Sequence, residues 1–151
     1  MTDLDLPAVH RRFAAECFNG VWDLLNKEER SEEDVAEMTH MAHASLWHWR
    51  QTGQATAQNF AVGTWQLSRV YAVVNNPEQA RRYGEESLRL CRDHHLDAFY
   101  LAYAHEALAR AAAGAGDQAE KEHQMAAAGQ VAARIEADSN REALLRDLAT
   151  I

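Results

Sequence analysis

Apolar residues recur every three or four positions along almost the whole chain, which is the spacing of an amphipathic helix. Short runs of turn-forming residues interrupt this pattern, and two prolines and seven glycines leave little material for additional turns. No run alternates apolar and polar residues between turn signals, as a half-buried strand would. The pattern therefore predicts an all-α fold with helices at about residues 7–26, 31–51, 54–74, 77–94, 97–113, 118–137 and 141–151.

Residues with a known role at helix ends mark several of these boundaries. Ser31 is followed three positions later by Asp34, which is the spacing of a capping box. Asn76 precedes Pro77, so the asparagine can cap a helix whose first turn holds the proline. Asp117 can cap the sixth helix in the same way. Turns this short join antiparallel helices, so the sequence predicts one domain, residues 1–151, with hairpins at about 7–51, 54–94 and 97–137 and a last helix at 140–151. In this last helix the apolar spacing predicts four inward-facing residues: Leu144, Leu145, Leu148 and Ile151.

Two stretches of the chain repeat each other at a spacing of about forty residues. The matching positions are Leu67, Ser68, Tyr71, Ala80, Gly84 and Ser87 in one copy and Leu108, Ala109, Ala112, Ala119, His123 and Ala126 in the other. Residues 65–128 resemble the tetratricopeptide repeat (TPR) family in its longer-period form. In the second copy, the first helix of the repeat ends at a Gly-Asp turn. The resemblance implies a right-handed, TPR-like stack of helical hairpins with a C-terminal capping helix.

The same resemblance implies a groove that is lined by the first helix of each hairpin and binds a peptide or a partner protein without catalysis. At the matching positions of this sequence the groove residues are Val62, Trp65, Arg69 and Ala72, followed by Tyr103, Glu106, Arg110 and Ala113. Arginine and tryptophan could together recognise a carboxylate or a peptide. Alternatively, Glu106 forms an internal salt bridge with Arg69 or Arg110 that ties two repeats together. The sequence leaves both readings open.

The second helix contains two histidines, His40 and His43, that lie three residues apart on one face. Such a pair could hold a metal ion, and histidine also titrates near neutral pH as a general base. The alternative function is thus a metal-binding or small-ligand-binding domain centred on this pair. However, the repeat places both histidines where helices pack, and there a neutral, hydrogen-bonded histidine is the more common case. We therefore expect structural histidines and no metal or other cofactor.

Two Glu-x-x-His motifs, at residues 37–40 and 120–123, lie on different predicted helices, with Glu16 and Glu106 on two more. Di-iron helical bundles use this set of ligands. A chain of this composition contains about 0.7 such motifs by chance, so two carry little information. Glu106 and Glu120 also lie at different distances from the turn of their hairpin. At a rise of 1.5 Å per residue, the two carboxylates differ in height by roughly 8 Å. The sequence therefore does not favour a di-iron site.

Charge and cysteine content narrow the possible partners further. The net charge of −8 disfavours nucleic acid and anionic membranes as partners, and no stretch is long and apolar enough to predict a membrane span. The acidic first residues do not resemble a signal peptide, so we expect a cytoplasmic protein in which Cys17 and Cys91 are buried, inert thiols. No catalytic motif is present, which predicts that the protein is not an enzyme. A structural homodimer that covers apolar ends of the stack is a further alternative.

Overall fold

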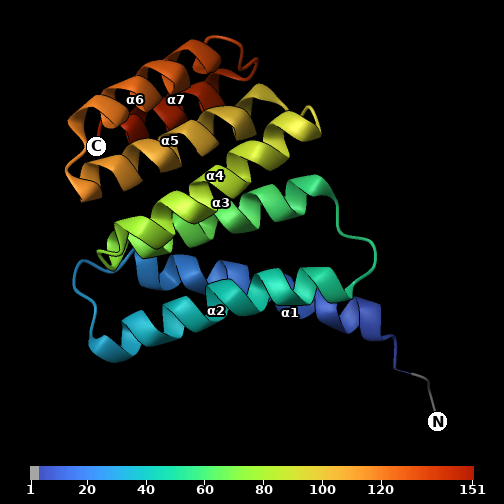
Figure 1. The fold of residues 1–151 in the computed structure, drawn as a ribbon. Coiled ribbons are helices and arrows are strands. Elements are labelled where there is room, and N and C mark those ends of the chain that lie inside the picture. The colour runs from blue at the N-terminus through green and yellow to red at the C-terminus, as the bar shows by residue number, and fades with distance from the viewer. Residues whose placement is uncertain (1–3) are drawn as a thin grey trace.

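The computed structural model describes residues 4–151 as an all-α fold, in which 80% of the described chain is helical and no strand occurs (Figure 1). The all-α prediction is therefore confirmed. The seven helices are α1 (Leu6–Leu25), α2 (Glu32–Gln51), α3 (Ala57–Val73), α4 (Pro77–Asp93), α5 (Ala98–Ala115), α6 (Gln118–Ala132) and α7 (Asp138–Leu148).

Helices that are neighbours in sequence are also neighbours in space. The largest contacts join α1 to α2, α3 to α4, α5 to α6, and α4 to α5, while α2 packs less extensively on α3. The first helix of the third pair, α5, also lies against the first helix of the second pair, α3, and α7 lies against both α5 and α6. The pairs follow one another from the α1–α2 end of the molecule to the α6–α7 end (Figure 1).

Three of the predicted helix starts are present. Ser31 and Asp34 form a capping box in which each side chain accepts a hydrogen bond from the other residue's backbone amide. The side chains of Asn76 and Asp117 cap α4 and α6 by accepting hydrogen bonds from amides three residues further on. These short polar side chains satisfy backbone amides that have no partner within the helix, which fixes where each helix begins.

The third helix begins later than the sequence analysis predicted, at Ala57 instead of residue 54. A second capping box, between Thr56 and Asn59, sets this start: the Thr56 amide donates to Asn59 Oδ1 at 2.9 Å. Asparagine in place of the usual Glu or Gln makes this motif harder to recognise in sequence.

The connection between α6 and α7 also differs from the prediction. We expected the sixth helix to continue to residue 137 and residues 138–140 to interrupt the pattern, but α6 ends at Ala132 and α7 begins at Asp138. Ile135 lies between them and is buried, and its carbonyl accepts a hydrogen bond of 2.6 Å from Arg141 Nη1. Burial of this single apolar side chain stabilises an irregular connection that the helical pattern does not reveal.

Within α7 the buried face is narrower than expected. Leu144 and Leu148 are buried, as predicted, and Ile151 packs against them, but Leu145 is 49% exposed. The prediction that Leu145 points inward was therefore wrong. Only one stripe of α7 faces α5 and α6, and a residue adjacent in sequence is rotated about 100° away from it.

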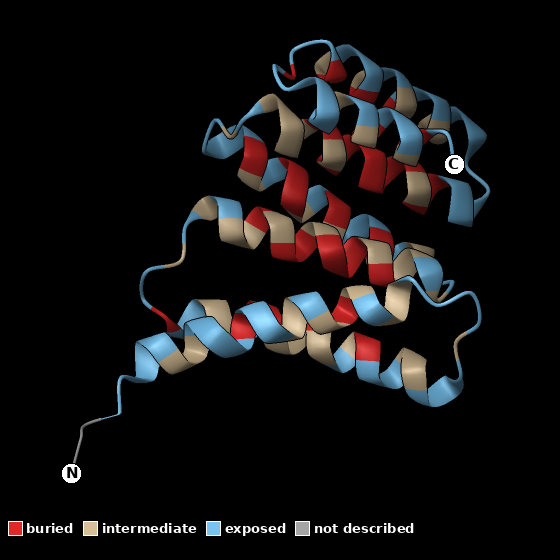
Figure 2. Cartoon of the chain, turned by 180° about the vertical axis from the view of Figure 1, so that it is seen from behind, coloured by how far each residue is buried: buried red, intermediate tan, exposed pale blue. Residues whose placement is uncertain are grey.

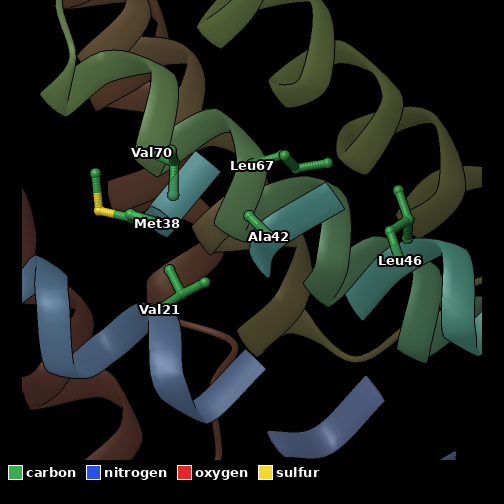
Figure 3. Packing of buried hydrophobic residues seen from close by; sticks show 6 residues of the cluster. All are labelled: Val21, Met38, Ala42, Leu46, Leu67 and Val70. Atoms are coloured by element: carbon green, nitrogen blue, oxygen red, sulfur yellow. The ribbon is translucent and has the colours of Figure 1, made fainter. Parts of the chain in front are cut away.

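Buried residues are concentrated where the helices face one another (Figure 2). Figure 3 shows one group at the junction of α1, α2 and α3: Val21, Met38, Ala42, Leu46, Leu67 and Val70. A second group joins α5 and α6 to α7, and a third lies among α3, α4 and α5. The first and third groups each join a pair of helices to the first helix of the next pair, so neighbouring pairs bury apolar surface together.

The spacing of small residues along one face of α4 predicts that a neighbouring helix packs closely there, and the structure confirms this. Ala80, Gly84, Ser87 and Cys91 are all buried. A Cβ atom built on Gly84 would lie 2.9 Å from Leu108 Cδ2 and 3.2 Å from Leu108 Cγ, which is too close for an ordinary contact. The glycine is therefore needed because α5 approaches α4 at this point.

We expect Gly84→Leu to lower the free energy of unfolding by about 1–2 kcal/mol, because overpacking against Leu108 outweighs the better helix propensity of leucine. Gly129→Leu is the matched control, since nothing lies within 4 Å of a Cβ at that helical glycine. It is expected to leave stability unchanged or to raise it by up to about 0.8 kcal/mol. Urea denaturation of both variants checks this, and equal effects would contradict the close approach of α4 and α5.

Candidate functional site

A buried carboxylate connects the second and third pairs of helices. Glu106 of α5 is completely buried, and its Oε1 atom accepts a hydrogen bond of 3.1 Å from Arg69 Nη2 on α3. Arg110 Nε, one turn further along α5, donates to the same oxygen, and Trp65 Nε1 donates to Oε2 at 3.4 Å. These four residues are called the Glu106 cluster below. The internal salt bridge that the sequence left open is thus present, with both arginines at once.

The last helix contributes a second carboxylate, Asp147, which the sequence analysis did not single out. Tyr103 Oη donates a hydrogen bond of 2.8 Å to Asp147 Oδ2, and Arg110 Nη2 donates to the Asp147 carbonyl at 2.8 Å. Arg110 Nη2 also donates to Thr150 Oγ1 at 2.6 Å. The Glu106 cluster therefore extends to α7 and holds it against α5. No local pattern marks Asp147, because its partners lie about forty residues away along the chain.

Burial, followed by the hydrogen bond to Asp147, raises the pKa of Tyr103 well above its usual value. The phenol consequently stays protonated and remains a hydrogen-bond donor over the whole physiological pH range. Asp147 itself is only partly covered, since 40% of its side chain is exposed. One face of this carboxylate is therefore accessible from solvent.

Next to this carboxylate is a cavity of about 280 Å³, called the aromatic hollow below. It is lined by Trp22 of α1, Val62 and Trp65 of α3, and Phe99, Tyr100 and Tyr103 of α5, with Ala61, Ser87 and Asp147 completing the wall. The lining is thus mainly aromatic, and its polar groups are few.

The aromatic rings around the hollow contact one another in series. The ring centroids of Trp22 and Trp65 are 5.5 Å apart, those of Trp65 and Tyr103 are 5.3 Å apart, and those of Tyr103 and Phe99 are 5.0 Å apart. The last two pairs are edge-to-face, which is a favourable arrangement for aromatic rings. Packing between rings from three helices keeps the wall of the hollow in a defined shape.

The structure divides six of the eight predicted groove residues into two groups, while Ala72 and Ala113 belong to neither the aromatic hollow nor the Glu106 cluster. Val62, Trp65 and Tyr103 line the aromatic hollow, and Trp65 also belongs to the Glu106 cluster. Arg69, Glu106 and Arg110 are instead engaged with one another. The sequence analysis missed Trp22, Phe99 and Tyr100. Their aromatic character was the available signal, but the helical pattern alone did not show that they face the same space.

The two histidines of the alternative metal site differ in their surroundings. His40 is exposed, whereas the Nε2 atom of His43 is 2.8 Å from Tyr71 Oη and its ring packs edge-on against Tyr71 and Tyr83. Among residues 4–151, no three His, Cys, Asp or Glu side chains are grouped so that they could hold a metal ion. Of the carboxylates considered for a di-iron site, Glu106 faces arginines and is unsuited to bind a cation.

The two cysteines are free thiols, and burial raises the pKa of both. Cys91 is the more buried and its pKa rises to about 11, so it is protonated at neutral pH. A protonated thiol is a poor nucleophile and a poor metal ligand, which agrees with the inert thiols expected from the sequence.

No helix in the described part of the chain is long and apolar enough to cross a membrane. Comparison with models of protein families, with characterised proteins and with solved structures gave no match to this chain.

We expect Glu106→Gln to lower the free energy of unfolding by about 3 kcal/mol, because it removes the carboxylate that contacts both largely buried guanidinium groups. Glu85→Gln is the matched control, since it breaks the exposed Arg81–Glu85 pair and should change stability much less. Denaturant unfolding of both variants provides the measurement. Similar small losses would show that the Glu106 cluster does not stabilise the fold.

Three histidines lie where burial disfavours the charged imidazolium. Burial lowers the pKa of His43, His48 and His105 below that of a free histidine. His105 is the most enclosed: its Nδ1 donates to Gln124 Oε1 at 2.7 Å, which offsets part of the lowering, while Arg92 adds to it. As the pH falls, these histidines take up protons near pH 6.5 in the unfolded chain and only at a lower pH in the folded protein.

The free energy of unfolding is therefore expected to be constant above about pH 7.5 and to fall as the pH decreases through about 6.5, because the unfolded state then binds more protons. We expect His105→Gln to reduce this dependence, because it removes the most enclosed of the three histidines. Urea titrations at several pH values between about 5.5 and 8 measure the slope. An identical slope for His105→Gln and the wild-type protein would contradict the assignment.

Proposed function

We propose that this chain is a non-catalytic, TPR-like binding module that holds a peptide or a segment of a partner protein in the aromatic hollow. The observation that supports this most directly is that side chains from α1, α3 and α5 converge on one space and leave it unfilled. In the proposed architecture the pairs α1–α2, α3–α4 and α5–α6 form a right-handed stack, with α7 as its cap.

The order of helix contacts supports this architecture. Each pair packs on the next in chain order, and α3 lies against α5, as the first helices of adjacent repeats do in such a stack. In α7 the buried face covers the α5–α6 pair, while the exposed Leu145 belongs to the opposite surface. A terminal helix of this kind protects the core at the end of an array.

The chemistry of the hollow indicates what part of a partner it accepts. The positive charges of Arg69 and Arg110 are compensated by Glu106 and Asp147, so the cluster has no excess charge to offer a ligand. The remaining surface is aromatic, and a cavity of about 280 Å³ accommodates one or two side chains but not a folded element. We therefore propose that a large apolar side chain of the partner enters the hollow as an anchor.

Asp147 is placed to recognise the backbone of the same segment. Its carboxylate lies at the wall of the hollow, is partly exposed, and can accept hydrogen bonds beyond the one from Tyr103. An apolar anchor combined with a polar contact at the rim is a common arrangement in peptide recognition. No observation favours the metal-binding function centred on His40 and His43, since His43 is engaged with Tyr71.

We expect Val62→Phe to weaken peptide binding at least tenfold, because the added ring fills the hollow without removing any of its hydrogen bonds. Val73→Phe makes the same change on the same helix at an exposed position outside the hollow, and is expected to have no effect. Peptides are first selected on the wild-type protein from a random display library, and their dissociation constants are then measured by calorimetry on all three proteins.

Two outcomes would contradict the proposal. Selected peptides that bind Val62→Phe as tightly as the wild-type protein would place binding elsewhere, and failure to select any peptide would argue against the module as a peptide binder. Circular dichroism of both variants confirms that each is folded before binding is compared.

A further inference from the structure

A second, larger hollow of about 750 Å³ lies between α2 and α4, with the beginning of α3 as its floor. This α2–α4 groove is lined by His43, Trp47 and Arg50 of α2, Phe60 and Thr64 of α3, and Arg82, Tyr83, Glu86 and Leu90 of α4, together with Leu46. It shares no lining residue with the aromatic hollow. The groove is therefore a separate feature of the surface, formed mainly by the second helices of the first two pairs.

The positive charges in the α2–α4 groove, unlike those of the Glu106 cluster, are not paired with carboxylates of the described chain. Arg50 and Arg82 both line the groove, and neither forms a salt bridge with a carboxylate in residues 4–151. The one carboxylate in the lining, Glu86, is held by Arg89, with 2.6 Å between Arg89 Nη2 and Glu86 Oε1. The groove thus presents two unpaired guanidinium groups on a protein whose net charge is −8.

Flat apolar surface lies beside these charges. The Trp47 side chain is 53% exposed, which is unusual for the largest apolar residue, and it lines the groove together with Phe60 and Leu90. Tyr83 is held in place by stacking on Tyr71, with ring centroids 5.7 Å apart and an interplanar angle of 3°. The groove therefore combines a fixed aromatic wall with a tryptophan that packs edge-on against His10 and His48 and is still more than half exposed.

We propose that the α2–α4 groove binds a small organic anion with a flat apolar body, whose carboxylate or phosphate is met by Arg50 and Arg82. A guanidinium group offers parallel N–H donors that match either anionic group, and Trp47 and Phe60 provide surface for an aromatic ring. The size of the groove lies within the range of about 300–1,000 Å³ that is usual for small-molecule sites. This site is independent of peptide binding in the aromatic hollow.

The probe for this site is 2-naphthoate, compared with the neutral 2-naphthamide of the same shape and with 2-naphthyl phosphate. Two-dimensional NMR titration of the wild-type protein is expected to show the carboxylate binding at least tenfold more tightly than the amide, with shifts centred on Trp47 and Arg82. The phosphate is expected to bind more tightly than the carboxylate if the natural ligand carries a phosphate, and no more tightly if it carries a carboxylate.

Three variants locate the interaction. Arg50→Gln/Arg82→Gln is expected to weaken 2-naphthoate binding at least tenfold, and Trp47→Ala to weaken all three probes, because they lose the same aromatic contact. Arg81→Gln is the matched control: it removes one positive charge next to Arg82 but outside the groove, and should leave binding unchanged. All four changed side chains are at least partly exposed, so the variants are expected to fold.

Several results would overturn the proposal. One is the absence of 2-naphthoate binding up to about 5 mM, and another is equal affinity for the acid and the amide. A third is an unchanged affinity of the Arg50→Gln/Arg82→Gln variant. None of these outcomes bears on the Val62→Phe experiment, so the two proposals succeed or fail separately.

Discussion

The fold depends on a carboxylate that is buried among positive charges at the junction of three helices. Glu106 has no contact with solvent, and it is stabilised there only because Arg69 reaches it from α3 and Arg110 from α5. Arg110 then continues to the backbone of α7 through the Asp147 carbonyl. Moving one of these charges into a protein interior alone would cost several kcal/mol, so the three must assemble together. The cluster thereby sets how α3, α5 and α7 lie relative to one another, and the aromatic hollow is formed between them.

The two hollows differ in how their charges are used. Beside the aromatic hollow, arginines and carboxylates neutralise one another, and what remains for a ligand is aromatic surface and one partly exposed carboxylate. In the α2–α4 groove, Arg50 and Arg82 have no such partners, and an exposed tryptophan lies beside them. Paired arginines stabilise the fold, whereas unpaired arginines in a concave surface are available to bind an anion. This contrast is why we assign an apolar anchor to the first hollow and an organic anion to the second.

Sequence patterns located most of the helices because their end signals are local. The capping box at Ser31 and the Asn76–Pro77 pair involve residues within one turn, so their physical effect is readable without knowledge of the fold. The buried small face of α4 was also predictable, since its spacing fits a helix that approaches another closely. The end of α6 could not be predicted from the sequence, because burial of Ile135 and the hydrogen bond that its carbonyl accepts from Arg141 fix the connection to α7. Those contacts depend on where α7 lies.

The sequence by itself determined the all-α class and the approximate extents of the helices, because helix formation and capping are governed by interactions between residues up to four positions apart. It also placed Val62, Trp65 and Tyr103 on faces that now line the aromatic hollow. Only the tertiary structure decided that Glu106 binds both arginines and that Asp147 joins them. It likewise decided that Trp22 completes the aromatic wall. Apart from the Glu106–Arg110 pair within one turn of α5, these pairings join residues about forty positions apart, and such contacts are set by the packing of whole helices rather than by any local pattern in the chain.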